Sequence, residues 1–209
     1  MNKIFSTANC LYSKLLRLIE SISFLPSLLL RLYLASLFWT TGWNKANSFS
    51  DTVAWFGNPN WGLGLPFPEI NAALAVSAEI GGAALLALGL ATRLACIPLI
   101  VTMIVAAATV HLKNGWQFIY DRMSVFPPDD ISEAMERLNR AKEILRQHGD
   151  YSWLTEHGNI VMSNNGIELV AAYTIMLLAL MVLGGGKYIS LDYWIALKRS
   201  CRACCSSTE

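Results

Sequence analysis

The chain has 209 residues and a formal net charge of +1, with 54% hydrophobic and only 15% charged residues. Ordinary soluble domains carry roughly 25% charged residues, so an ordinary soluble protein is disfavoured. The sequence contains no glycine-rich nucleotide loop, hydrolase elbow or zinc-ligand spacing, and we expect no nucleic-acid partner.

The first 22 residues are expected to remain on the protein as an amphipathic lead-in on the cytoplasmic side. Lys14, Arg17 and Glu20 interrupt any apolar core in this stretch, and no small-residue cleavage site follows. A secretory signal peptide needs both features, so a cleavable signal is not predicted.

Apolar residues are concentrated in four blocks, each near the roughly 20 residues that a helix needs to cross a bilayer. The predicted spans are residues 23–43, 70–90, 93–112 and 166–186. A soluble helical bundle would show a polar stripe on every helix, yet residues 94–110 contain no charged or amide side chain. The predicted fold class is therefore all-α, a polytopic four-helix membrane bundle over residues 23–192.

The basic residues near the span ends set the expected orientation. They lie in the lead-in, in the second connection and after the fourth span, at Lys3, Lys14, Arg17, Arg93, Lys187, Lys198, Arg199 and Arg202. Residues 193–209 are the predicted cytoplasmic tail. We therefore expect both termini in the cytoplasm and a multi-pass protein of a bacterial inner membrane. Five tryptophans are predicted to form a belt at the opposite face: Trp39, Trp43, Trp55, Trp61 and Trp116.

Two outer loops are predicted. The first, NKANSFSDTVAWFGNPNWGLGLPFPEI, is rich in aromatic residues, glycine and proline, and is read as an ordered cap or re-entrant loop. The second is an insert over residues 113–165, and its segment PPDDISEAMERLNRAKEILRQHGD predicts an amphipathic helix outside the membrane. That helix either covers the bundle or binds a partner, and the pattern favours the covering role.

Two charged residues fall inside predicted spans, Arg31 in the first and Glu79 in the second. An unpaired charge in lipid is costly, and charged groups there commonly pair with one another. Counting roughly 1.5 Å per residue from the inner edges puts Arg31 and Glu79 within reach of each other. An Arg31–Glu79 ion pair is therefore predicted.

Four polar residues fall near the outer span ends and are predicted to form an outer polar cluster: Lys45, Glu69, His111 and Glu168. His111 and Glu168 are expected at similar depth, so a hydrogen-bonded pair is reasonable, and both are candidate catalytic residues. Histidine exchanges protons near neutral pH. The alternative is an interfacial histidine that contacts headgroups or water.

The cysteines Cys10, Cys96, Cys201, Cys204 and Cys205 are all predicted on or near the cytoplasmic side, where thiols stay reduced. The last three have a spacing suited to a soft metal such as Cu(I), although incidental cysteines in a frayed tail are favoured. No haem is expected, because bis-histidine ligation needs two facing histidines and only one lies at a span.

Short motifs along the chain resemble the DoxX family of four-helix bacterial inner-membrane proteins. They are RLYLASLFWTTGWNKA, AEIGGAALLALGLATR, VHLKNGW and GGGKYISLDYW. WFGNPNWGLGLPFP and YSWLTEHGNIVMSNNGIELVAAYTIMLL are similar to the HvfX branch, which is associated with maturation of copper-binding ribosomal peptides. The family pattern carries over to residues Arg31, Gly42, Lys45, Glu79, Gly82, Gly89, Arg93, Ser190 and Asp192.

The resemblance implies three alternative roles. The leading one is an accessory to the maturation or export of a copper-binding peptide, or to copper and redox homeostasis. The expected partners are then the lipid bilayer and that peptide, its modifying enzymes or a redox protein. The second is a small subunit of a quinone-linked oxidoreductase. The third is a non-catalytic scaffold. Copper or quinone would be the associated cofactor, and enzyme activity does not follow from the fold.

Overall fold

The computed structural model describes residues 12, 14–17 and 20–206, and side chains up to residue 199. Most of the predicted lead-in, residues 1–22, lies outside them. The regular structure in the described part is helical, apart from an isolated antiparallel bridge between Ile119 and Ser163. The chain divides into two compact units, one of residues 1–102 and 175–209 and one of residues 103–174.

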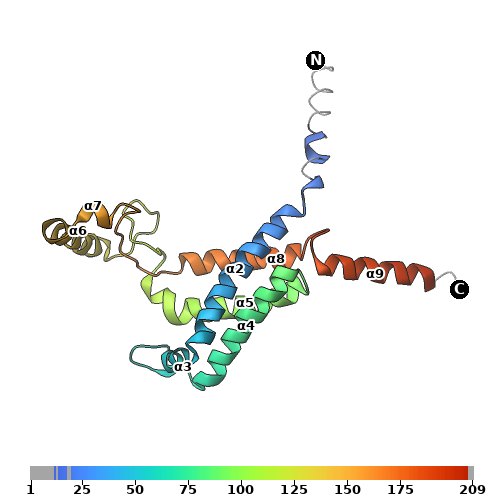
Figure 1. Cartoon of the computed structure of the whole chain (residues 1–209), viewed down its shortest axis with the longest axis horizontal. Helices are drawn as coiled ribbons and strands as arrows, with labels where there is room; N and C mark the ends of the chain where they lie inside the picture. The colour runs from blue at the N-terminus through green and yellow to red at the C-terminus, as the bar shows by residue number, and fades with distance from the viewer. Residues whose placement is uncertain (1–11, 13, 18–19, 207–209) are drawn as a thin grey trace, which may run out of the picture. The chain divides into compact units, whose positions relative to one another are not determined.

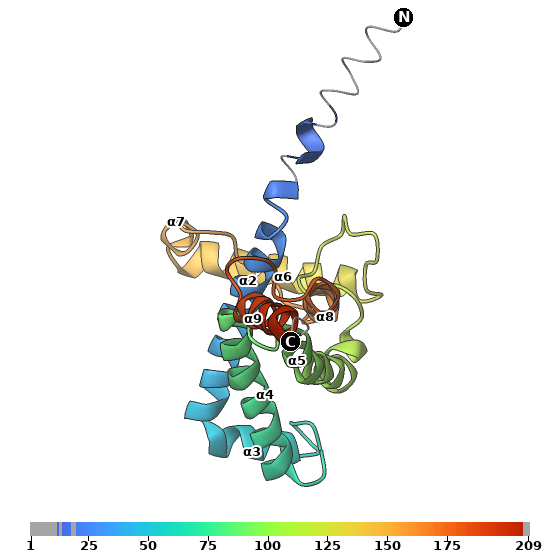
Figure 2. The ribbon, with the colours of Figure 1, turned by 90° about the vertical axis from the view of Figure 1, so that its right-hand side faces the viewer.

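The first unit is built on two helices that pack side by side, α2 (Leu25–Asn47) and α4 (Pro68–Leu88), shown in Figures 1 and 2. A proline near the start of each helix suits the first turn, where a backbone N–H has no helical partner. Helix α4 ends at Gly89, whose φ of +64° is the left-handed conformation that favours glycine.

A short helix, α3 (Phe49–Gly57), lies in the predicted aromatic loop, where the sequence indicated turns. The rest of the loop folds back onto it, because the N–H groups of Leu63 and Leu65 donate to the carbonyls of Trp55 and Phe56 at 2.8 Å each. The loop is therefore ordered, as the sequence predicted.

Helices α5 (Thr92–Ala106), α8 (Glu168–Leu183) and α9 (Leu191–Ser206) contribute wholly or in part to the first unit. Its core is apolar and includes Leu34, Phe38, Leu86, Leu99, Leu177 and Leu180. Many large apolar side chains point outward instead, including Leu29, Leu32, Leu74, Leu94, Ile97 and Val101. Large exposed apolar patches are uncommon on soluble monomers and mark surfaces that contact a membrane or another protein.

Within the described residues, two stretches of helix are long and apolar enough to cross a membrane, Pro68–Leu88 and Thr92–Asn114. They coincide with the predicted spans 70–90 and 93–112. Helix α8, at the predicted span 166–186, is a shorter apolar helix of 16 residues. Helix α2 is long enough but carries more polar residues, so the four-span arrangement stays a prediction.

In the second unit, α5 continues into a π-helical turn (Ala107–His111) and a 3-10 turn (Leu112–Asn114). Residues 115–120 and 162–168 then run antiparallel, joined for example by Tyr120 N–H to Met162 O at 3.1 Å. The predicted amphipathic helix is present as α6 (Ile131–His148), followed by the short α7 (Tyr151–Leu154). Helix α6 buries Ala134 and Leu138 and ends before Gly149.

Candidate functional site: a buried ion pair beside an enclosed arginine

Glu79 is buried in α4, and its carboxylate is paired with Lys45. The Lys45 Nζ lies 2.7 Å from Oε1 and 2.6 Å from Oε2, with 5% of the Glu79 side chain exposed and 29% of the Lys45 side chain exposed. The pair joins α4 to the last turn of α2. One partner is thus enclosed and the other reaches the surface of the helix pair.

A close approach of α2 and α4 at Gly42 makes this pairing geometrically feasible. A Cβ at position 42 would lie 2.8 Å from Ile80 Cγ1 and 2.9 Å from Glu79 Cβ. Only glycine leaves room there, so the backbones approach closely and Lys45, one turn further along α2, can reach the carboxylate. Gly42 therefore belongs to the site as much as the charged residues do.

The predicted Arg31–Glu79 pair is wrong, because the register of the two helices separates these residues. Gly42 is level with Glu79, and Arg31 lies eleven residues earlier on α2, about 16 Å away along a helix at roughly 1.5 Å per residue. The predicted pairing assumed that the inner ends of the first two spans lie at the same level in the membrane. In the structure the end of α4 is level with Arg31, well inside α2.

Arg31 is 1% exposed, and backbone carbonyls satisfy its guanidinium. Nε donates to Leu86 O at 2.8 Å and Nη2 to Ala87 O at 3.1 Å, while Nη1 donates to Ile189 O at 3.0 Å and also to Gly185 O. The last carbonyls of a helix have no intrahelical partner and carry partial negative charge. Arg31 therefore caps α4 and ties it to the turn after α8.

The same turn is fixed by neighbouring polar residues. Asp192, in the first turn of α9, accepts hydrogen bonds from Ala91 N–H at 2.7 Å and Thr92 N–H at 2.9 Å at the start of α5. Ser190 Oγ donates to Gly89 O at 2.9 Å, and Ser27 Oγ donates to Gly184 O at 2.6 Å. These contacts join α2, α4, α5 and α9, so this end of the unit is a rigid polar junction.

His111 and Glu168 lie in the second unit, but their hydrogen bonds go to the backbone rather than to each other. His111 Nδ1 is 2.9 Å from Asn165 O, and Glu168 Oε2 accepts from Phe118 N–H at 3.0 Å. The predicted hydrogen-bonded pair is therefore replaced by two backbone contacts. Since a carbonyl only accepts, Nδ1 donates in this contact, and no hydrogen bond of Nε2 occurs among the described residues.

The predicted outer polar cluster divides between the two units. Lys45 and Glu69 belong to the first unit, and His111 and Glu168 belong to the second. Lys45 forms an ion pair with Glu79, and Glu69 is exposed in the first turn of α4. A single cluster of all four residues stays a prediction.

No group of three or more His, Cys, Asp and Glu residues able to hold a metal ion occurs in the part of the chain that the structure describes. The side chains of Cys201, Cys204 and Cys205 lie outside that part, so metal binding by the tail cysteines stays a prediction. Cys96 is buried in α5 as a free thiol.

The described residues define the class of protein: it is all-α, two of its helical stretches are long and apolar enough to cross a membrane, and many large apolar side chains are exposed. Residues 27–112 match the family model described as DoxX. The match includes Arg31, Gly42, Lys45, Glu79 and His111, and excludes Glu168 and Asp192. Neither the curated proteins nor the solved structures compared with the chain include a match.

Proposed function

We propose that the chain is a DoxX-type multi-pass protein of a bacterial inner membrane that assists the maturation or export of a copper-binding ribosomal peptide, or copper and redox homeostasis. The proposal is based on the DoxX match over residues 27–112, together with two HvfX-like segments, one inside the match at residues 55–68 and one after it at residues 151–178. Four spans, with both termini in the cytoplasm, complete the proposed topology.

In the proposed accessory role, copper is carried by the partner peptide. The described side chains offer no three-ligand metal site, and the side chains of Cys201, Cys204 and Cys205 lie outside them. His111 offers one open nitrogen, since Nδ1 is engaged by Asn165 O. A single imidazole can accept a proton or add one ligand to copper that a partner already holds.

The quinone-linked alternative receives less support. It places Arg31, Glu79 and the His111 and Glu168 region around a quinone or proton site. The Arg31 donors are used by four carbonyls, however, and Glu79 is engaged by Lys45. A quinone site needs free hydrogen-bond donors at its carbonyl oxygens, and Arg31 is enclosed.

The copper role is tested by complementing a deletion strain with wild type, His111→Ala and His148→Ala, and measuring copper tolerance beside protein abundance in the membrane fraction. His148 is an exposed histidine at the end of α6, so it is a matched control. We expect His111→Ala to lower tolerance at normal abundance and His148→Ala to leave it unchanged. Unchanged tolerance in the deletion strain itself would contradict the copper role.

Topology is tested separately with reporters fused after Glu209. A fluorescent reporter that matures in the cytoplasm should be active, and alkaline phosphatase, which needs the periplasm, should be inactive. The reverse pattern would contradict the proposed cytoplasmic C-terminus.

A further inference from the structure

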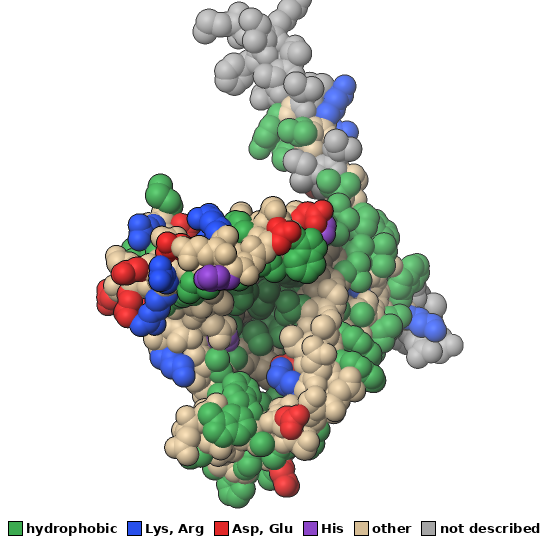
Figure 3. Space-filling view, turned by 60° about the vertical axis from the view of Figure 1, so that its left-hand side comes forward, with side chains coloured by type: hydrophobic (Ala, Val, Ile, Leu, Met, Phe, Trp, Pro, Cys, Tyr) green, Lys and Arg blue, Asp and Glu red, His purple; other side chains and the backbone are tan. Residues whose placement is uncertain are grey.

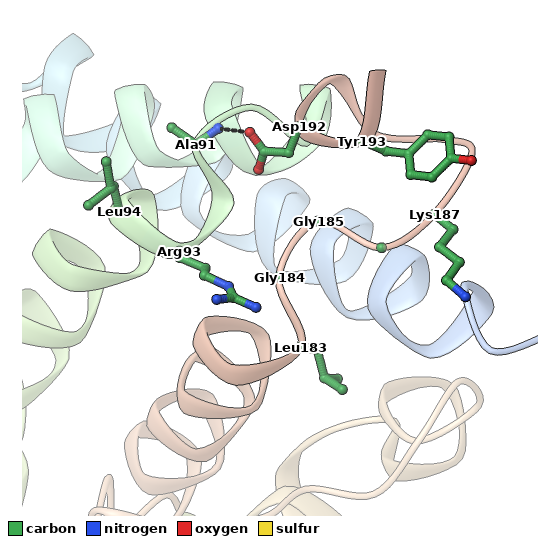
Figure 4. Close-up of a pocket in the computed structure, with 10 residues that line it drawn as sticks. Ala91, Arg93, Leu94, Leu183, Gly184, Gly185, Lys187, Asp192 and Tyr193 are labelled. Carbon is green, nitrogen blue, oxygen red and sulfur yellow. Dashed lines mark hydrogen bonds between the residues drawn. The ribbon is translucent and has the colours of Figure 1, made fainter. Parts of the chain in front are cut away.

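A pocket of about 490 Å³ lies in the first unit, where the α4–α5 turn, the glycine turn after α8 and the start of α9 meet (Figure 4). Its lining includes two basic residues, Arg93 and Lys187, together with Leu94, Leu183, Asp192 and Tyr193. The pocket borders the polar junction described above, which shares Ala91, Gly184, Gly185 and Asp192 with its lining. Neither the Lys45–Glu79 pair nor His111 lines it.

The cationic groups of this pocket are free to bind an anion. Arg93 Nη2 donates to Val182 O at 3.2 Å, which positions the guanidinium and leaves most of its five N–H donors unused. No described residue pairs with the Lys187 ammonium. Asp192 is the acidic lining residue, and its oxygens are already engaged by Ala91 N–H and Thr92 N–H.

The same contacts exclude the start of α5 as the anion-binding element. A free helix N-terminus attracts anions through its unpaired N–H groups. Here the Asp192 carboxylate occupies that position. An anionic ligand would therefore be held by the Arg93 and Lys187 side chains, and Arg93 offers the planar fork that phosphate oxygens accept.

The pocket also borders an apolar surface. Leu94 and Leu183 are 68% and 55% exposed at its edge. Further exposed apolar side chains continue from them along α5 and α8: Ile97, Val101, Ile175, Leu178 and Val182. A free inorganic anion would gain nothing from these neighbours, whereas the acyl chains of a lipid would cover them.

Aromatic residues beside the pocket independently indicate a membrane–water interface. The ring of Tyr193 lies 5.6 Å from that of Tyr188 and 5.7 Å from that of Trp194, and Trp194 Nε1 donates to Tyr188 O at 2.9 Å. Tyrosine and tryptophan gather at the level of lipid headgroups, where one end of the ring is apolar and the other is wet.

We propose that this pocket binds the phosphate-bearing headgroup of an anionic phospholipid, with Arg93 on the phosphate, Lys187 as the second positive charge and the acyl chains along α5 and α8. The proposal rests on the membrane placement given above, and it does not depend on the copper role. Basic pockets at the cytoplasmic ends of membrane helices are suited to such headgroups.

The test uses the full-length protein in nanodiscs of phosphatidylcholine containing a minor fraction of phosphatidylglycerol, with retained lipid counted by native mass spectrometry. Arg93→Gln/Lys187→Gln is compared with Lys198→Gln/Arg199→Gln, which removes the same charge from exposed positions on α9 outside the pocket. We expect retained phosphatidylglycerol to fall roughly tenfold in the first variant and less than about twofold in the second. Lys187→Gln alone should lose roughly fourfold, and it removes no described contact on which folding could depend.

Three outcomes would overturn the proposal, in distinguishable ways. Recovery of the wild type from the soluble fraction would overturn the membrane placement and the lipid site together. Equal phosphatidylglycerol retention in the two double variants, with wild type in the membrane, would overturn the lipid site alone. Displacement of the lipid by inorganic phosphate at equal concentration would overturn the lipid as the source of the phosphate.

Discussion

The two units of the chain carry charge in opposite ways. In the first unit the charged side chains Arg31 and Glu79 are buried, and each is fully engaged by specific partners. In the second unit the charges gather on the surface of α6, as Figure 3 shows, in pairs such as Arg140–Glu143 at 2.7 Å. Exposed pairs of this kind contribute little to stability, whereas a stranded buried charge is costly. Removing either of these two buried charges should therefore have a large effect on stability, and removing an exposed charge of α6 a small one.

The largest effect is expected for Arg31→Met. The variant removes the guanidinium donors to the carbonyls of Leu86, Ala87, Gly185 and Ile189, of which the contacts to Leu86 and Gly185 are buried. We expect the free energy of unfolding to fall by about 3–5 kcal/mol, measured by SDS titration in mixed micelles. Arg31→Lys keeps the charge but lacks the planar fork, so it should recover less than half of the loss. A change within about 1 kcal/mol for Arg31→Met would contradict the capping role.

The next largest loss of stability is expected for variants of the Lys45–Glu79 pair. Glu79→Gln and Lys45→Met should each lower the free energy of unfolding by about 2–3 kcal/mol, less than a wholly buried pair because Lys45 is 29% exposed. The double variant should recover about 1–2 kcal/mol relative to the sum. Arg31→Met combined with Glu79→Gln should instead be additive, since these residues do not touch. Coupling between Arg31 and Glu79 would restore the original pairing hypothesis.

The sequence predicted helices at all four apolar blocks and the amphipathic α6, because their signals are local. Apolar periodicity, prolines at helix starts and glycines at helix ends act over a few residues. The sequence also identified Arg31 and Glu79 as residues that need partners, because an unpaired charge inside a predicted membrane span is energetically costly.

The partners themselves were not predictable, because they depend on register and backbone geometry. The close approach of α2 and α4 at Gly42 places Lys45 within reach of the Glu79 carboxylate. Arg31 donates to backbone carbonyls. Every residue has one, so no sequence motif identifies which of them will accept. The glycine run 184–186 was the available signal for a tight turn near Arg31, since glycine permits positive φ where Gly184 and Gly186 adopt it.

The role of Gly42 in setting this register is tested by Gly42→Ala. A new Cβ would lie 2.8 Å from Ile80 Cγ1 and 3.2 Å from the Ile80 backbone nitrogen, so the helices must separate. We expect a loss of about 1–2 kcal/mol in the free energy of unfolding. Gly81→Ala is the matched control, because nothing lies within 4 Å of its added Cβ, and it should gain about 0.5–1 kcal/mol from helix propensity. Equal effects at the two positions would show that propensity, and not close packing, governs Gly42.

The smallest effect is expected at Tyr120 in the second unit, whose hydroxyl donates to Asp130 Oδ2 at 2.7 Å. This hydrogen bond raises the pKa of Tyr120, with smaller contributions from burial and from the Asp130 charge. A raised pKa means that folding favours the neutral phenol. The stabilisation is therefore fully present below the unfolded pKa of about 10 and is lost as pH rises through the higher folded pKa.

Because the pair is exposed, Tyr120→Phe should lower the free energy of unfolding by only a few tenths of a kcal/mol at neutral pH. The difference between wild-type and Tyr120→Phe ultraviolet titrations gives the folded pKa directly, and a value at or below that of free tyrosine would contradict the hydrogen bond.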